Sequence, residues 1–171
     1  AEAVVIGAAV THAEIRRSPI VQTHLPSLSQ AAATIGGAQI QARGTIAGSV
    51  ANASPAGDLG PSLLVTDGRV VVASKAGERE IELTKFFLGY RKIDLQPDEL
   101  IVRFVLPKIH PGCRESFRKL GPRAAQAMVR GFRQDWVTSP RAGGCRAAAA
   151  AAFPARRHHP DHHRHRMTPA P

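Results

Sequence analysis

The segment Thr45–Asp58 constrains this chain more than any other part of the sequence. Its fourteen residues hold only two sizeable apolar side chains, Ile46 and Val50, and the others are small or hydrogen-bonding. Such a segment buries too little apolar area to offset the ordering of its backbone, so it cannot form a core strand. Gly48 and Gly57 would let the backbone approach a ligand closely. Backbone N–H groups and side-chain hydroxyl groups of the segment could then hold the oxygen atoms of a polyanion. The segment predicts either a phosphate-binding loop or a plain surface turn.

Short blocks on both sides of this segment follow one another in a recognisable order. They are Val5–Thr11, Gln39–Thr45, Asp58–Leu64, Gly77–Arg79, Phe86–Lys92, Pro97–Ile101 with Pro107, and Phe117–Arg123. In this order the chain resembles the FAD-binding subunit of the molybdenum hydroxylases, the xanthine dehydrogenase and carbon monoxide dehydrogenase family. The resemblance covers about residues 3 to 129. It identifies the family but not the substrate.

The resemblance implies a PCMH-type FAD-binding fold, and the residue pattern predicts the same α+β class. Most connections between predicted elements are short, which favours a mostly antiparallel sheet with helices. The resemblance further implies that residues 1–44 are an incomplete N-terminal lobe, the remnant of the first FAD-binding lobe, and that 45–129 form the second. Residues 130–171 leave the family pattern and are expected to be a disordered tail.

Local patterns place the elements. Thr11 and Glu14 have the spacing of a capping box, which predicts a helix start. Pro26 precedes apolar residues at helical spacing, so a second helix should begin there and end at Gly36-Gly37. Asp67-Gly68 predicts a hairpin between strands at 63–66 and 70–74. Further strands are expected at 4–10, 78–83, 100–106 and 115–120.

The resemblance implies electron relay through FAD, with the redox chemistry supplied by the cofactor. Electrons would pass from iron–sulfur clusters through FAD to NAD or another acceptor. The [2Fe-2S] clusters and the molybdenum cofactor would sit only on partner chains, an iron–sulfur subunit and a molybdopterin-binding subunit. No residue of this chain is assigned a catalytic or a metal-binding role.

The resemblance also implies which residues would hold FAD. The second phosphate loop would be Thr45, Ile46, Ala47, Gly48 and Ser49. Asn52 and Asp58 would make polar contacts to the dinucleotide, the carboxylate being suited to ribose or adenine. Ile35 would line the adenine side, and the main chain of Ile101 would meet the flavin or adenine. Lys119 would lie near the flavin ring, although its alternative is an ordinary exposed lysine.

Two departures from the family pattern predict that FAD binds weakly or not at all. The family carries a first phosphate loop of Gly-Gly-Thr type, which is expected upstream of Val4 and is not in the sequence. The second loop reads Ala47-Gly48-Ser49 where the family usually has Gly-Gly-Asn, and the extra methyl group could strain the turn. The missing lobe would also leave the apolar stretch Val4–Val10 uncovered, which predicts self-association.

The last quarter of the chain has a different composition. Residues 129–171 hold 8 Lys+Arg and 2 Asp+Glu, a net charge of +6, whereas residues 1–128 hold 15 and 11, a net of +4. No leucine or isoleucine occurs in this tail, so it cannot build a core, although its alanine run could form a helix. Two alternative hypotheses follow, a degenerate fragment without function and a basic nucleic-acid-binding protein. The second is disfavoured because the charge sits in a tail with one Trp and no recognisable recognition helix.

Cysteine spacing and hydropathy bear on the compartment. Cys113 and Cys145 lie far apart and give neither a metal-ligand spacing nor a disulfide framework, which favours a reducing cytoplasm. No apolar run has the length of a membrane span, and no charged-then-apolar leader is present. The sequence therefore predicts a cytoplasmic protein without a membrane partner.

Overall fold

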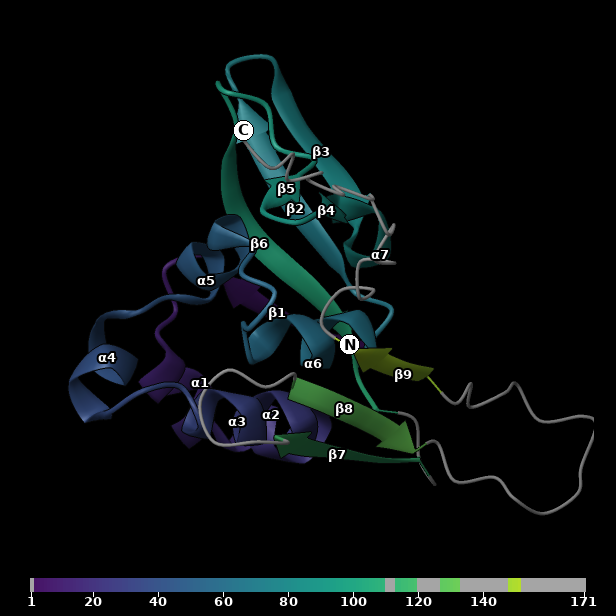
Figure 1. The fold of residues 1–171 in the computed structure, drawn as a ribbon. Coiled ribbons are helices and arrows are strands. Elements are labelled where there is room, and N and C mark those ends of the chain that lie inside the picture. The colour runs from purple at the N-terminus through teal and green to yellow at the C-terminus, as the bar shows by residue number, and fades with distance from the viewer. Residues whose placement is uncertain (1, 110–112, 120–126, 133–147, 152–171) are drawn as a thin grey trace, which may run out of the picture.

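The computed structural model describes residues 2–109, 113–119, 127–132 and 148–151 (Figure 1). The helices are α1 (His12–Arg17), α2 (Pro19–His24), α3 (Pro26–Ala33), α4 (Ala38–Arg43), α5 (Ile46–Asn52), α6 (Leu59–Leu64) and α7 (Leu83–Phe86). The strands are β1 (Ala3–Gly7), β2 (Arg69–Ser74), β3 (Gly77–Glu82), β4 (Phe87–Gly89), β5 (Lys92–Ile93), β6 (Leu100–Pro107), β7 (Arg114–Lys119), β8 (Ala127–Phe132) and β9 (Ala148–Ala151). The fold is α+β, as the sequence predicts.

A four-stranded antiparallel sheet organises the described residues, in the order β1-β6-β2-β3. β1 opens the sequence but pairs with β6, a hundred residues later, with Val5 opposite Val105. The stretch expected to belong to a first lobe thus joins the same sheet as strands from the second. Helices α1, α2 and α3 lie side by side near the β1 end of this sheet (Figure 1).

Two predicted helix starts are confirmed. Thr11 caps α1 and accepts a hydrogen bond from the N–H of Glu14, whose carboxylate in turn accepts from the Thr11 N–H at 2.7 Å. α3 begins at Pro26, which occupies its first turn, and ends at Ala33. Gly36, three residues beyond that end, has a positive φ of 48°. The reciprocal cap satisfies N–H groups that a helix leaves without partners, which fixes where α1 starts.

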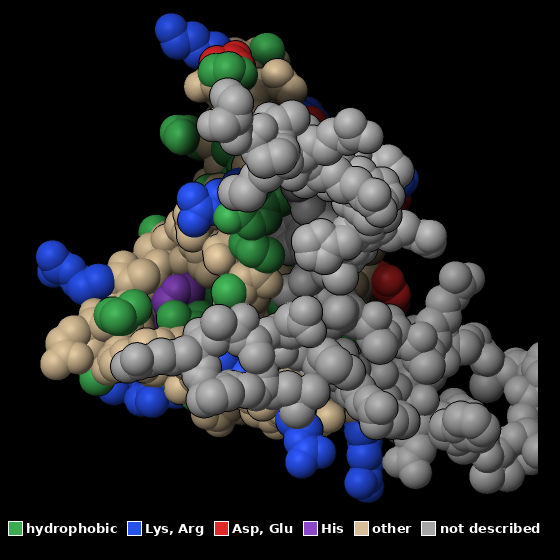
Figure 2. Space-filling view, viewed as in Figure 1, with side chains coloured by type: hydrophobic (Ala, Val, Ile, Leu, Met, Phe, Trp, Pro, Cys, Tyr) green, Lys and Arg blue, Asp and Glu red, His purple; other side chains and the backbone are tan. Residues whose placement is uncertain are grey.

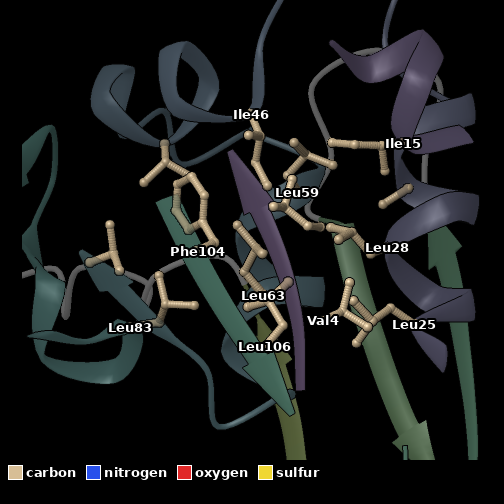
Figure 3. Packing of buried hydrophobic residues seen from close by; sticks show 14 of the residues in the cluster. Val4, Ile15, Leu25, Leu28, Ile46, Leu59, Leu63, Leu83, Phe104 and Leu106 are labelled. Carbon is tan, nitrogen blue, oxygen red and sulfur yellow. The ribbon is translucent and has the colours of Figure 1, made fainter. Parts of the chain in front are cut away.

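One hydrophobic core lies between the sheet and these helices (Figure 3). β1 and β6 contribute Val4, Phe104 and Leu106, and α3 contributes Leu28 from the other side. Leu59 and Leu63 of α6 are fully buried in the same cluster. Burying these aliphatic and aromatic side chains supplies the main driving force for the fold, at roughly 1.5–3 kcal/mol for each.

A second sheet, in the order β7-β8-β9, packs against the helices rather than against the first sheet. β7 contacts α3, and both β8 and β9 contact α6. Most of residues 130–171, including the histidine-rich stretch, lies outside the described residues. Ala148–Ala151 is a strand paired with β8, whereas the alanine run had allowed the prediction of a helix. Pairing with a neighbouring strand overrides the helix propensity of alanine.

The predicted hairpin at Asp67-Gly68 is wrong. Residues 59–64 form the helix α6 instead of a strand, and the hairpin joins β2 to β3 through Lys75-Ala76. Asp67 does reverse the chain, with φ 52°, but it connects a helix to a strand. A short apolar run such as Leu63–Val65 suits a buried helix as well as a strand, which is why its periodicity misleads.

Cys113, which directly precedes β7, is disulfide-bonded. The cysteine spacing predicted no disulfide framework, and this single bond removes the argument that the cysteines favour a reducing cytoplasm.

Candidate functional site

The predicted phosphate loop begins as a helix. Residues 46–52 form α5, and the Thr45 side chain caps it by accepting a hydrogen bond from the N–H of Gly48 at 3.1 Å. Ile46 and Val50, four residues apart, lie on one face of the helix and are buried in the core. The small residues between them leave the opposite face open, where Gly48 is exposed and Ser49 half-buried.

The first N–H groups of α5 are already used within the protein. Ile46 donates to the carbonyl of Val10 at 3.0 Å and Ala47 to that of Ala8 at 3.3 Å. Ser49 donates to the Thr45 carbonyl, and Gly48 to the Thr45 hydroxyl oxygen. The helix start therefore offers a ligand its hydroxyl groups rather than free backbone donors.

His12 contacts the residues that directly precede α5. Its backbone N–H donates to the carbonyl of Gly44 at 3.0 Å, and Thr11 forms a β-bridge with Thr45. A Cβ at Gly44 would lie 2.9 Å from Cδ2 of the His12 ring, so the two residues are in close contact. The ring is buried, its Nδ1 has no hydrogen-bond partner among the described residues, and burial lowers the pKa of His12. The imidazole is thus favoured in its neutral form.

A buried carboxylate lies beyond the other end of α5. Asp58 precedes α6 and is only 7% exposed. Its Oδ2 accepts hydrogen bonds from the Lys119 ammonium at 2.8 Å and from the Thr34 hydroxyl at 3.1 Å. Its Oδ1 is buried and accepts no hydrogen bond within the described structure. A buried, unpaired carboxylate oxygen is costly, so this atom marks a place for a donor that the described residues do not supply.

Lys119 reaches Asp58 because β7 is fixed to α3. The Ser27 hydroxyl donates to the Glu115 carboxylate at 2.9 Å, and the N–H of Phe117 donates to the side-chain oxygen of Gln30 at 2.9 Å. Lys119 lies at the end of this strand with its side chain 35% exposed. Two segments about sixty residues apart in the sequence thereby meet at one carboxylate.

The other predicted site residues divide into two groups. Ile35 and Ile101 are partly buried and pack against the core, and Ile46 is fully buried, so its side chain cannot contact a ligand. Asn52 is exposed at the end of α5. α5 contacts both α6 and β6, which places the phosphate-loop residues, Asp58 and Ile101 on neighbouring elements.

Sequence reasoning missed two residues at this site, Thr34 and His12. Thr34 follows α3, and its hydroxyl lies within hydrogen-bond distance of both the Ala31 carbonyl and the Asp58 carboxylate, which share its one proton. A threonine after a helix carries no distinctive sequence signal. His12 lies in the first turn of a helix whose start was predicted. Only the long-range contact with Gly44 gives this histidine its place at the site.

Arg79 belongs to a separate ion-pair network. Its guanidinium donates to Glu99 at 2.6 and 2.8 Å and to the Asp94 carboxylate at 3.0 Å. These hydrogen bonds from Arg79, together with one from the Gln96 N–H, lower the pKa of Glu99 to about 2. The network ties β3 to the segment between β5 and β6, which gives Arg79 a structural role in this part of the molecule.

Comparison with known proteins identifies the class that this fold and site define. Residues 1–109 match the family described as the FAD binding domain in molybdopterin dehydrogenase. That match covers more than half of the chain, and the chain belongs to this family.

Individual relatives agree with the family match. The chain is 35% identical over 147 residues to the 6-hydroxypseudooxynicotine dehydrogenase complex subunit alpha of Paenarthrobacter nicotinovorans, covering 86% of this chain and 49% of the relative. It is 31% identical over 136 residues to the carbon monoxide dehydrogenase medium chain of Hydrogenophaga pseudoflava, covering 80% and 44%. The chain thus spans about half the length of the curated relatives it matches.

A solved structure shares the fold. Carbon monoxide dehydrogenase from Hydrogenophaga pseudoflava, in a form lacking the Mo-pyranopterin moiety of the molybdenum cofactor, superimposes with a TM-score of 0.71 at 30% sequence identity. The superposition covers 76% of this chain and 47% of the other. The antiparallel sheet with its helices is therefore the fold of that enzyme's matching chain.

The described residues show neither a membrane-spanning helix nor a metal-binding cluster. No helix there has the length and apolar character needed to cross a membrane. No group of three or more His, Cys, Asp or Glu side chains in those residues is arranged to hold a metal ion.

Proposed function

We propose that this chain is the FAD-binding part of an electron-transfer subunit of a molybdopterin-dependent dehydrogenase. Electrons would arrive from iron–sulfur clusters on a partner subunit and leave through FAD to NAD or another acceptor. FAD, when bound, supplies the redox chemistry, and this chain binds and orients it. The parent substrate would be bound by a separate molybdopterin-binding subunit.

The observation that carries this proposal is the unpaired Oδ1 of Asp58. A ribose hydroxyl is a donor of the right kind for a buried carboxylate oxygen, and such a hydrogen bond is worth about 1.5–3 kcal/mol when one partner is charged. Thr34 and Lys119 hold Oδ2, which leaves the buried Oδ1 as the acceptor without a partner among the described residues. We therefore assign Asp58 to the adenosine half of FAD.

The start of α5 fits a pyrophosphate only in part. The hydroxyl groups of Thr45 and Ser49 can donate to phosphate oxygens, and exposed Gly48 leaves room for close approach. The N–H groups there are engaged in the protein, so fewer donors than a phosphate loop normally supplies are available. We accordingly expect FAD to bind this chain weakly.

The resemblance assigns Lys119 to the flavin ring and Asp58 to the adenosine side, whereas their side chains form one ion pair. In this conformation the ion pair with Lys119 fixes the orientation of the Asp58 carboxylate. We propose that it acts as a positioning residue for the adenosine half, with Ile35 and Ile101 as apolar walls. The division into lobes at residues 1–44 and 45–129 remains part of this proposal.

Partners and location follow from the same proposal. The names of the relatives describe a complex subunit and a medium chain, which supports partner subunits carrying the iron–sulfur and molybdenum centres. The cytoplasm stays our proposal for its location, although the disulfide at Cys113 removes the cysteine argument for a reducing compartment. On the coloured part of the face in Figure 2, Lys and Arg side chains lie at separate places rather than in one patch, so this part of the surface offers nucleic acid no continuous basic footprint.

Ligand choice tests the proposal. Equilibrium dialysis of the full chain against FAD, and separately against FMN, should give saturable but weak binding of FAD and at least about tenfold weaker binding of FMN, which lacks the adenosine half. Saturable binding of FMN as tight as that of FAD would overturn the assignment of Asp58. Absence of any saturable FAD binding would overturn the proposed function of the chain.

A further inference from the structure

We propose that His12 is a pH-sensitive switch for the turn at Gly44 and Thr45: its neutral ring holds the turn against α1, and protonation of the ring releases it. The switch is a property of the fold itself. Its effect on FAD rests on the proposed function, in which Thr45 is one of the residues that hold the cofactor.

Backbone contacts join the start of α1 to the residues that precede α5. The N–H of His12 donates to the Gly44 carbonyl at 3.0 Å, and the preceding residue, Thr11, forms a β-bridge with Thr45. Thr45 in turn caps α5, because its hydroxyl oxygen accepts a hydrogen bond from the N–H of Gly48 at 3.1 Å. A displacement of residue 12 is therefore transmitted through the turn to the first residues of α5.

The His12 ring fits its place only as a neutral group. His12 is 4% exposed, and a Cβ at Gly44 would lie 2.9 Å from Cδ2 and 3.0 Å from Nε2 of the ring, so the ring needs a glycine at that position. Its Nδ1 is buried and has no hydrogen-bond partner among the described residues. A protonated ring carries a proton on both nitrogens, and burying it without acceptors is costly. The charged ring is therefore more stable in water, outside this place.

The charges on the elements around His12 do not favour its protonation. The charged and titratable side chains on α1 and on the helices that pack against it are Glu14, Arg16 and Arg17 on α1, His24 on α2 and Arg43 on α4, whereas α3 carries none. Glu14, the one acid of this set, is bound to the N–H and the hydroxyl of Thr11, at 2.7 Å each. Burial lowers the pKa of His12 below its ordinary value of 6.5.

The direction of the pH effect follows from this burial. Above pH 6.5 the ring is neutral whether the turn is held or released, so the switch does not respond to pH there. Below pH 6.5 a released ring takes up a proton that the buried ring does not, so the released form gains population as the pH falls. Uptake of one proton shifts this equilibrium by at most about thirtyfold between pH 6.5 and about pH 5.

NMR spectroscopy of the full chain without ligand tests the switch. Between about pH 7.5 and about pH 5 the backbone amide signals of Gly44, Thr45 and Gly48 should move with the midpoint at which the His12 ring titrates. His12→Gln cannot take up the charge, so these signals should stay fixed in that variant. His24→Gln, at a half-buried histidine of α2, is the matched control and should respond as the native chain does. Amide signals that stay fixed in the native chain, or that move equally in His12→Gln, would overturn the proposal.

Equilibrium dialysis against FAD measures the consequence for the cofactor. FAD should bind the native chain and His24→Gln between about threefold and thirtyfold more weakly at about pH 5 than at about pH 7.5, and His12→Gln should lose this difference. Equal FAD affinity of the native chain at both pH values would overturn the link between the switch and the cofactor and leave the proposed function standing. Absence of saturable FAD binding at both pH values would instead overturn the proposed function, and the amide signals alone would then decide whether His12 is a switch.

Discussion

At the scale of single residues, the candidate site depends on side chains that contacts with other residues of the protein hold in place. Gly44 contacts the buried His12 ring, and its neighbour Thr45 caps α5. Asp58 is held by Thr34 and Lys119 on one oxygen, and its other oxygen is buried without a partner among the described residues. The contacts of His12 with Gly44 and of Asp58 with Thr34 and Lys119 are long-range, and so the residue types alone do not reveal them.

A methyl group at Gly44 should disturb the start of α5. In Gly44→Ala the Cβ would lie 2.9 Å from the His12 ring and 3.1 Å from the Ile40 carbonyl, and neither buried ring nor helix backbone can move freely. We expect a loss of about 1–3 kcal/mol in the free energy of unfolding, measured by urea denaturation. Gly37→Ala is the control, since its Cβ would meet only the flexible Gln39 side chain at 3.3 Å. Equal stability of the two variants would contradict this packing.

Glu99 should make the protein sensitive to acid. Its pKa is lowered from 4.5 to about 2 in the folded state, chiefly by hydrogen bonds from Arg79. A lowered folded-state pKa contributes stability that is present above the unfolded value of 4.5 and is lost as the pH falls toward 2. Glu99→Gln should therefore have a lower melting temperature at pH 7 and a shallower fall in melting temperature between pH 4.5 and pH 2. Parallel melting curves for the two proteins across that range would refute this role.

At the scale of elements, local capping signals are reliable and apolar runs are not. The cap at Thr11 correctly predicts α1, because the chemistry that begins a helix lies within four residues. α5 was expected as a loop, although Ile46 and Val50 already had helical spacing. The helix α6 was expected as a strand, because a run of three apolar residues carries no period. The hairpin at Lys75-Ala76 has no typical turn sequence, so the sequence did not predict it. The pairing of β2 with β3 shows where it lies.

Removing the cap at Thr11 should destabilise α1 and the bridge beside Thr45. Thr11→Ala deletes the side chain that holds the Glu14 N–H, and we expect a loss of about 0.5–2 kcal/mol in the free energy of unfolding. Thr23→Ala on α2 is the matched control, because that exposed threonine makes no cap. Chemical denaturation measures the free energy of unfolding of both variants. If Thr23→Ala loses as much stability as Thr11→Ala, the capping role of Thr11 is contradicted.

At the scale of the whole molecule, one sheet connects the beginning of the chain to its family-specific motifs. β1 pairs with β6, and the site lies where α3, α5, α6 and β7 come together. Family resemblance predicted the fold class and the set of candidate residues from the order of short blocks. It could not predict the joint use of Asp58 by Thr34 and Lys119, because that depends on how β7 packs on α3.

The core beneath the site should be required for folding. Phe104 is fully buried on β6, between β1 and β2. Phe104→Ala should cost about 3–5 kcal/mol, a large share of the stability of a small domain. Leu88→Ala, at a side chain that is 65% exposed, should change the melting temperature little. Thermal unfolding by circular dichroism compares them, and a similar shift for both would contradict the placement of the core.

The central claim is that Asp58 holds the adenosine half of FAD through its free Oδ1. The most direct measurement is the dissociation constant of FAD for the native chain, for Asp58→Asn and for Asp98→Asn, an exposed control. Losing a hydrogen bond to a charged acceptor should weaken FAD binding roughly tenfold to a hundredfold in Asp58→Asn, with no change in the control. Equal FAD affinity in Asp58→Asn and the native chain would contradict the account.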